Sequence, residues 1–268
     1  MDLKNISGLP LSLENGKIVL SKEAVSLPAS YREPEEAKPY FMDENADFGP
    51  ARHALQGEAG GADWLYEMVR GVHFEKDKDI FEKKGLRFDI TNIKSGVAGK
   101  ELVKTIGHFH KDSSSEVYEV LSGEAIFLLQ EISGNKVFLI KAGPGEKVVI
   151  PSGFGHITVN AGKENLILSD ISSADMDPDY EFFKAKKGAA YRAVASENGF
   201  KIEKNNNWAE EKELKIGRPK EAPELGIFFS KNLYGSFVEN PEKFDFIRNP
   251  EKYASVLAPE NLFEFSGQ

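Results

Sequence analysis

The sequence predicts an all-β fold, a sandwich or barrel, in the central part of the chain. Between residues 87 and 171, short runs rich in β-branched and aromatic residues follow one another with a period of two. Clusters of Gly, Asn, Ser and Pro separate them, such as Ala-Gly-Pro-Gly-Glu at 142–146 and Pro-Ser-Gly-Phe-Gly at 151–155. Regularly spaced short strands with such turns are typical of sandwiches and barrels, and not of alternating strands and helices.

These runs place the expected strands one by one. We expect eight strands, at 87–93, 101–106, 116–121, 124–130, 136–141, 147–151, 156–160 and 165–171. Their lengths are those of ordinary strands. Segments 189–195 and 199–203 have a similar character and are candidates for further strands at a sheet edge.

The region before these strands is mixed in character. Residues 1–86 contain scattered prolines and glycines, and we interpret them as an arm that wraps the barrel and then connects to it. Within segment 62–70, apolar residues recur at roughly helical spacing, which indicates a short helix. Segment 74–86 is strongly charged, so we expect a solvated connection there.

The composition changes again after residue 208. The tail from 209 to 268 contains five prolines, and the tetrapeptide Asn-Pro-Glu-Lys occurs at 240–243 and at 249–252. Asn followed by Pro is a good start signal for a helix, so we expect two short helices. The chain then divides into an N-terminal arm and connection (1–86), a barrel (87–208) and a C-terminal helical appendage (209–268).

Composition and charge exclude several classes of protein. The chain has 268 residues, 40% of them hydrophobic and 29% charged, which is ordinary for a globular protein. It has no cysteine, which excludes disulfides, zinc–thiolate sites and cysteine nucleophiles. A net charge of −9 argues against a nucleic-acid or membrane binder, since both need a basic face. No long apolar run or signal-peptide pattern is present, and we expect a cytoplasmic protein.

Three of the five histidines occur in an informative pattern. His108 and His110 flank one residue at the end of a predicted strand, so both imidazoles can face the same side. Glu116 opens the next predicted strand, and His156 follows the turn at 151–155. Three imidazoles and a carboxylate suit a divalent ion such as iron, manganese, nickel or zinc, with open coordination positions left for a substrate.

Four other basic residues attract attention and carry no such pattern. His53 and His73 stand apart from the metal set, and we assign them no function. Lys104 and Lys111 bracket the His108–His110 motif and are candidates for holding an anion, but lysines are seldom buried. We therefore expect both lysines to face solvent.

At this point the motifs resemble a known family. Gly-His-Phe-His with Glu116 resembles the first cupin motif, and the stretch from Pro151 to Asn160 resembles the second. More specifically, segments 105–110, 116–130 and 151–162 resemble the cupin-type glucose-6-phosphate isomerases known chiefly from archaea. The likeness extends over about residues 10–208, and the tail has no counterpart in it.

The resemblance implies a fold, an activity and a set of site residues. The fold is a cupin jelly roll, or double-stranded β-barrel, and the activity is interconversion of glucose 6-phosphate and fructose 6-phosphate in glycolysis and gluconeogenesis. The implied cofactor is one divalent metal per chain, with iron favoured, and the implied assembly is a homodimer. His108, His110, Glu116 and His156 would be the metal ligands. Residues of the substrate site would be Thr91, Thr105, Gly107, Tyr118 and Tyr180.

The sequence also departs from the family pattern. Ser172 and Pro178 stand where the family has a Tyr and a His, and Val69 stands where it has another Tyr. These changes concern the sugar pocket and not the metal. In the chemistry, Glu116 could move the proton between C1 and C2 through an enediolate, or a metal-assisted hydride shift could do so without a base. The sequence leaves both routes open.

Two alternatives to this function stay open as well. One is another cupin enzyme, either an isomerase of a different sugar or an iron oxygenase. The other is a non-catalytic cupin that binds a sugar. In each of these cases the partner is a small molecule, and neither nucleic acid nor a membrane is expected.

Overall fold

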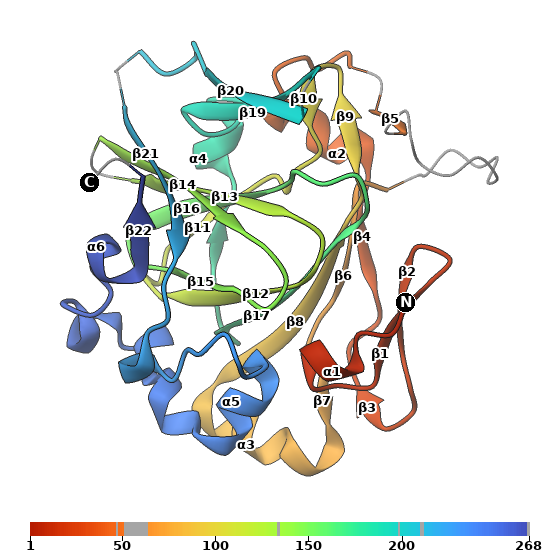
Figure 1. The fold of residues 1–268 in the computed structure, drawn as a ribbon, viewed down its shortest axis with the longest axis vertical. Coiled ribbons are helices and arrows are strands. Elements are labelled where there is room, and N and C mark those ends of the chain that lie inside the picture. Colours follow the sequence, from red (N-terminus) through yellow and green to blue (C-terminus); the bar gives the residue numbers. More distant parts are fainter. Residues whose placement is uncertain (47, 51–63, 133–134, 198, 210–211, 267–268) are drawn as a thin grey trace.

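Two facing β-sheets form the centre of the molecule (Figure 1). The computed structural model describes residues 1–46, 48–50, 64–132, 135–197, 199–209 and 212–266. Six antiparallel strands form the first sheet in the order β15–β12–β17–β8–β6–β4. Their bounds are β4 Ser30–Arg32, β6 Tyr66–Val69, β8 Leu86–Ile93, β12 Glu116–Ser122, β15 Lys147–Ile150 and β17 Leu166–Ser173.

The second sheet has five strands in the order β16–β13–β14–β21–β22. It is antiparallel except where β21 runs parallel to β14. The inner faces of the two sheets meet, because the rings of Tyr118 in β12 and Phe127 in β13 lie 5.4 Å apart. The bounds are β13 Ala125–Glu131, β14 Lys136–Ala142, β16 Phe154–Asn160, β21 Glu213–Pro219 and β22 Phe263–Phe265.

Smaller sheets and short helices surround this barrel. A five-stranded sheet has the order β20–β19–β10–β9–β5, and three two-stranded ladders pair β1 with β2, β3 with β7 and β11 with β18. Strand bounds are β1 Leu11–Glu14, β2 Lys17–Leu20, β3 Ala24–Val25, β5 Phe48–Pro50, β7 His73–Phe74, β9 Gly96–Ala98, β10 Glu101–Leu102, β11 Phe109–His110, β18 Pro178–Asp179, β19 Tyr191–Ser196 and β20 Gly199–Lys204. Helix bounds are α1 Lys4–Ser7, α2 Pro34–Ala37, α3 Lys78–Lys84, α4 Glu181–Lys184, α5 Leu233–Glu239 and α6 Pro259–Leu262. The 3₁₀ helices are η1 Lys38–Tyr40, η2 Glu75–Asp77, η3 Pro223–Leu225, η4 Pro241–Ile247 and η5 Pro250–Tyr253.

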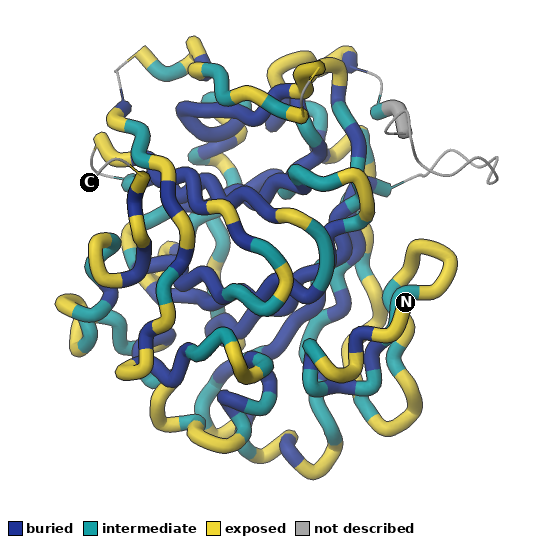
Figure 2. The backbone as a smooth tube through the Cα atoms, viewed as in Figure 1, coloured by how far each residue is buried: buried dark blue, intermediate teal, exposed yellow. Residues whose placement is uncertain are grey.

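Strand β17 shows why the barrel holds together. All eight of its residues are buried, since one face of the strand looks into the barrel and the other is covered by flanking segments. On the neighbouring strand β8, the outward ring of Phe88 packs 5.3 Å from the ring of Tyr234 in α5. Figure 2 shows buried residues along the central strands of both sheets, with exposed residues on strand β21 and in the peripheral loops. Burial of each such side chain contributes about 1.5–3 kcal/mol.

The N-terminal region contributes strands to the barrel sheet, which the sequence analysis did not predict. The helix expected in segment 62–70 is wrong: its described part forms strand β6, which pairs with β8 and β4. Pairing with β8 outweighs the helical spacing, because it satisfies the backbone groups of β6 along the sheet. The solvated connection at 74–86 is also wrong, since it contains α3 and buries Phe81 against Phe237 with ring centroids 4.6 Å apart.

The tail is a mixture of strands and helices. The two helices expected after the Asn-Pro-Glu-Lys repeats are present as η4 and η5, each beginning at its proline. Strands β21 and β22 were not expected, and they extend the second sheet. Phe237, Phe244 and Phe246 are fully buried. The tail therefore completes the hydrophobic core. The division of the chain at residues 87 and 209 stays a prediction. No helix in the described part of the chain is long and apolar enough to cross a membrane.

Candidate metal centre and active-site pocket

The four predicted metal ligands converge between the two sheets. His108 lies directly opposite His156, because their backbones exchange two hydrogen bonds of 3.2 and 2.9 Å. His110 ends β11, and Glu116 opens β12 in the first sheet. One ligand atom from each side chain lies within 4.8 Å of all the others. We call this group the metal wall.

The donor atoms have the spacing that a bound cation requires. Nε2 of His110 lies 3.2 Å from Nε2 of His108, and Oε2 of Glu116 lies 3.3 Å from Nε2 of both His110 and His156. Ligands about 2.0–2.2 Å from one ion are separated by about 3 Å. The buried Oε2 of Glu116 has no hydrogen-bond partner within the described residues. These four side chains therefore fit a divalent metal.

The orientation of His110 supports the same conclusion. Its Nδ1 lies 3.0 Å from the backbone oxygen of Ser114. A carbonyl only accepts hydrogen bonds, so Nδ1 carries the proton and Nε2 keeps its lone pair for a cation.

The pKa values of the four side chains favour the binding of a cation. Burial lowers the pKa of His156 to about 4 and holds the pKa of His108 well below its usual value, so both are neutral at pH 7. Burial alone would raise the pKa of Glu116, but contact with His110 and the other imidazoles lowers it well below its usual range. For His110 the effect of Glu116 outweighs burial, and the pKa is raised. The wall therefore presents two neutral imidazoles, a third imidazole that holds its proton more tightly, and one ionised carboxylate.

All five residues predicted for the substrate site line the pocket beside the metal wall. The hydroxyl of Tyr118 lies 3.2 Å from Nε2 of His156, and the ring of Tyr180 lies 5.6 Å from that of His108. The hydroxyl oxygen of Thr105 accepts a hydrogen bond from the backbone N–H of Thr158, which leaves its own hydrogen free to donate. The other two are Thr91 and Gly107. Their roles remain predictions.

Gly107 has a structural reason for being glycine. Its φ of +75° lies in the left-handed region, and a Cβ there would lie 2.3 Å from the side chain of Ile157. A larger residue would force the segment before His108 away from β16, which carries His156.

The three departures from the family pattern do not line this pocket. Ser172 is buried in β17, Pro178 pairs with His110 at the β11–β18 ladder, and Val69 faces a different groove. A tyrosine is nevertheless present on the same strand as Val69: Tyr66 lines the pocket. Its hydroxyl oxygen accepts a hydrogen bond of 3.3 Å from Nε of Arg32.

The sheet that carries Glu116 also brings charged residues into the pocket, and the sequence analysis missed them. Arg70 follows β6, Arg87 and Asp89 lie in β8, and Asp170 lies in β17. We call these four the strand wall. Burial raises the pKa of Asp89 and holds that of Asp170 well above its usual value, with the acidic neighbours of Asp170 adding to the effect. Arg32 adds a third guanidinium to the lining of the pocket.

A signal for the strand wall was present in the sequence. In β8, Arg87, Asp89 and Thr91 alternate with the buried apolar residues Phe88 and Ile90. Charged side chains that alternate with apolar ones on a central strand must face either solvent or a polar cavity. Because β8 pairs with a strand on each side, these side chains face a cavity and not solvent. This pairing is long-range, so the sequence of β8 alone does not reveal it.

The other basic candidates that the structure describes lie outside the pocket lining. Lys104 is only 2% exposed, contrary to the expectation, because it forms an ion pair with Glu101. Lys111 is exposed as expected, with its Nζ 3.7 Å from Asp177. His73 is half-buried, with Nδ1 2.9 Å from the oxygen of Gly71, and His53 lies outside the described residues.

Comparison with known proteins matches this chain to one family. A family model described as glucose-6-phosphate isomerase matches residues 45–211. The glucose-6-phosphate isomerase of Thermococcus kodakarensis is 32% identical over 211 residues, which make up 78% of this chain and 100% of that protein. The one from Pyrococcus horikoshii is 34% identical over 203 residues, or 75% of this chain and 96% of that protein.

Solved structures give weaker matches. Procruciferin from Brassica napus is 17% identical with a TM-score of 0.34, covering 43% of this chain and 27% of that one. Oxalate decarboxylase from Lactobacillus farciminis is 20% identical with a TM-score of 0.32, covering 44% of this chain and 30% of that one. Because the family model spans more than half of the chain and the relatives are covered almost completely, this protein belongs to the family of cupin-type glucose-6-phosphate isomerases.

Proposed function

We propose that this protein is a metal-dependent aldose–ketose isomerase that interconverts glucose 6-phosphate and fructose 6-phosphate. The observation that carries the proposal is the convergence of His108, His110, Glu116 and His156 in a pocket lined with hydroxyl groups. In the cell the reaction would serve glycolysis and gluconeogenesis, and we propose a cytoplasmic location. The relatives that bear the same activity in their names support this assignment.

The four side chains of the metal wall would hold one divalent ion per chain. Bound there, the ion would supply Lewis acidity toward the two oxygens at C1 and C2 of the sugar. We propose iron, with manganese, nickel and zinc as alternatives, because three imidazoles and one carboxylate suit each of these ions. Elemental analysis of untagged protein should find about one such ion per chain.

Glu116 is our candidate for the base of the reaction. Its lowered pKa keeps it ionised at neutral pH, as an acceptor of a carbon-bound proton must be. Removal of the proton at C2 of the aldose leaves its electron pair in a C1–C2 double bond, and the carbonyl pair moves onto O1. Return of the proton to C1 and transfer of the O2 proton to O1 then give the ketose. The hydride shift remains the rival, since it needs no base.

The hydroxyl-rich side of the pocket would hold the phosphate and the sugar. We propose Thr91, Thr105 and the backbone of Gly107 for the phosphate, with Tyr118 and Tyr180 along the sugar. Hydroxyls and backbone N–H groups stabilise an anion without a basic cluster. Arg32, which lines the same pocket, adds a positive charge that the sequence did not reveal.

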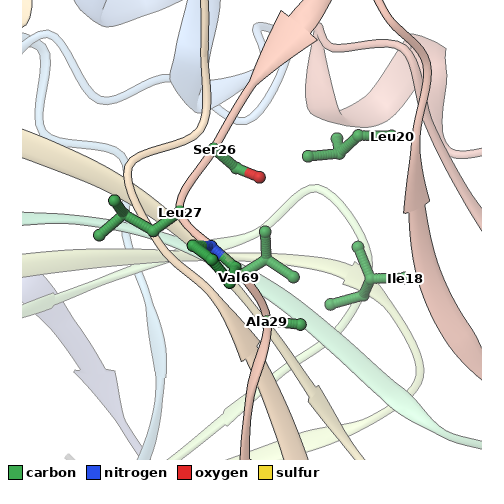
Figure 3. A pocket seen from close by; sticks show the side chains of 7 residues that line it. Ile18, Leu20, Ser26, Leu27, Ala29 and Val69 are labelled. Carbon is green, nitrogen blue, oxygen red and sulfur yellow. The ribbon is translucent and has the colours of Figure 1, made fainter.

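We also infer a homodimer, formed through the face of the N-terminal arm. An apolar groove lies between the arm and β6, lined by Ile18, Leu20, Leu27 and Val69 among others (Figure 3). Leu27 is 58% exposed, and β4 lies at the edge of the first sheet. Exposed apolar surface and a sheet edge both favour association. Leu27→Asp should shift a dimer to monomer in light scattering, and a monomeric wild type would contradict the inference.

The function is tested by a panel of substrates on metal-loaded protein. We expect turnover of fructose 6-phosphate in a coupled assay, and slower or no turnover of unphosphorylated fructose. Turnover of another sugar alone would replace the substrate and keep the mechanism. Oxygen consumption would favour an iron oxygenase, and sugar binding without any turnover would favour a binding module.

A further inference from the structure

In the strand wall, two acidic side chains are buried side by side, which lowers the stability of the fold. Asp89 and Asp170 are directly opposite each other on the neighbouring strands β8 and β17, and they are only 6% and 5% exposed. Like charges directly opposite on a sheet are destabilising, and a buried carboxylate needs partners. A barrel that needed only packing would have apolar residues at these positions.

Asp89 is saturated by the protein itself. Its two oxygens accept from Nε of Arg87, each at 2.9 Å, and Oδ1 also accepts from the backbone N–H of Gly71 at 2.9 Å. Nε of Arg70 lies 3.8 Å from Oδ2. Asp89 is therefore an anchor that fixes Arg87.

The terminal amino groups of Arg87 remain available as hydrogen-bond donors. It binds Asp89 only through Nε, and its two terminal amino groups form no hydrogen bond with the residues that the structure describes. The side chain is 23% exposed, against 8% for that of Asp89, and it lines the pocket. A guanidinium has five N–H donors in a fixed fork, so a fixed Nε aims the remaining four.

The register places Arg87 toward the metal wall. Ser172 is paired with Arg87, and Ile171 is paired with Val117, so Glu116, Ser172 and Arg87 follow one row across three strands. Only the small side chain of Ser172 stands between them, and its buried Oγ has no hydrogen-bond partner among the described residues. Burial lowers the pKa of Arg87, but Asp89, Asp170 and Glu116 more than offset this. Arg87 therefore remains charged, two strands away from Glu116 on the same sheet.

We propose that Arg87 is a catalytic residue, whose free amino groups bind the oxygens at the reacting end of the sugar and stabilise the negative charge of the enediolate. Asp89 is then a positioning residue that fixes this guanidinium. The inference rests on the proposed function and deepens it: when Glu116 takes the C2 proton, the negative charge left on O1 and O2 lies in a pocket that the positive Arg87 also lines. No atom is gained or lost beyond the isomerisation itself. A fixed charge aimed at a developing anion costs little reorganisation during the reaction.

Kinetics of two variants test the catalytic role. Arg87→Gln and Arg87→Ala should lower kcat by on the order of a hundred- to a thousandfold and change KM far less. Added guanidinium ion should raise the turnover of Arg87→Ala at least tenfold, because the ion can enter the cavity that the missing side chain leaves. Arg218→Ala, which removes an exposed arginine paired with Glu146, is the matched control and should keep full activity. Metal content and thermal melting of each variant check that it is folded.

Binding without turnover separates this inference from the proposed function. Arabinonate 5-phosphate carries a planar anionic carboxylate that mimics the enediolate, and arabitol 5-phosphate lacks that charge. Calorimetry should show that Arg87→Gln weakens arabinonate 5-phosphate more than tenfold and arabitol 5-phosphate less than threefold. Equal weakening of both, or a folded Arg87→Ala with undiminished kcat, would overturn the proposal. Wild-type protein that turns over no sugar would refute the proposed function, while the calorimetric preference would still decide on Arg87.

Discussion

The two walls of the pocket meet the same substrate with opposite chemistry. The metal wall holds three imidazoles and one carboxylate whose donor atoms lie 3.2–3.3 Å apart, which is the spacing of ligands around one cation. In the strand wall, the carboxylate of Asp89 already has its partners, because Arg87 and the backbone of Gly71 donate to it. The metal wall therefore needs a cation from outside the protein, whereas the strand wall supplies its own positive charge through Arg87. Loss of metal should therefore leave the strand wall in place.

The largest expected effect comes from removing the base while keeping the metal wall. In Glu116→Gln the amide oxygen can still coordinate, but it cannot take a proton at neutral pH. We expect metal content close to that of the wild type and a loss of turnover on the order of a thousandfold. Elemental analysis and the coupled assay measure both. A metal-loaded variant within a few-fold of wild-type turnover would favour the hydride shift.

The buried ion pair of Lys147 and Glu119 belongs to neither wall and tests whether stability and metal binding can be separated. Lys147 and Glu119 are 2% and 1% exposed, with Nζ 2.8 Å from the carboxylate, and Glu119 also accepts from the backbone N–H of Leu233 in the tail. Lys147→Met leaves Glu119 charged and unpaired, so the free energy of unfolding should fall by about 3–5 kcal/mol. Denaturant unfolding measures the change, and metal content of the folded protein should not change.

The matched control for that variant also removes the second charge. Glu119→Gln combined with Lys147→Met should recover part of the lost stability, since no uncompensated charge remains buried. A loss below about 1 kcal/mol in the single variant would contradict the importance of this pair for holding the tail on the barrel.

The metal wall should also make the metal-free protein sensitive to acid. His156 has a pKa of about 4 in the folded protein and about 6.5 when unfolded. Between these pH values the unfolded chain binds more protons, so stability is present above pH 6.5 and is lost as the pH falls toward 4. This one residue contributes up to about 3 kcal/mol. His110, with its raised pKa, acts in the opposite direction.

Urea unfolding of metal-free protein at pH 7 and pH 5 measures this dependence. The variant His156→Gln, which cannot be protonated, should show a clearly smaller difference between the two pH values. An unchanged difference would mean that other groups dominate the acid sensitivity.

The smallest effect is expected at an exposed pair beside the metal motif. Lys111 and Asp177 are 50% and 64% exposed. Exposed ion pairs contribute about 0–1 kcal/mol, so Lys111→Ala should leave turnover within twofold and stability within about 0.5 kcal/mol. A large rise in KM for the phosphorylated sugar would instead show that Lys111 helps to hold the phosphate.

The same contrast explains what the sequence could predict. The metal ligands could be predicted because His108 and His110 alternate along one segment, where spacing alone places them on one face, and Glu116 opens the next strand a few residues later. The strand wall brings Arg70, Asp89 and Asp170 together from three strands far apart in the sequence. Their position depends on the pairing of β6, β8 and β17, which local periodicity does not contain.

The errors in the fold have the same physical origin. The apolar spacing near β6 suits a helix, and pairing with β8 overrides it, because a sheet partner satisfies a row of backbone groups at once. Most charged residues of segment 74–86 face solvent, but Phe81 and the buried Asp77 contact the tail. Tail strands β21 and β22 form because a sheet edge at β14 is available, which no pattern within the tail reveals.

The central claim is that this pocket isomerises a sugar phosphate only when its metal wall is filled. The most direct test is the turnover of fructose 6-phosphate by protein stripped of metal and then restored with one equivalent of divalent iron. We predict loss of at least a hundredfold on stripping and recovery of most activity on restoring, with no recovery in the His108→Ala, His110→Ala double variant. Metal-free protein that keeps full turnover, or a double variant that recovers with the wild type, would contradict the account.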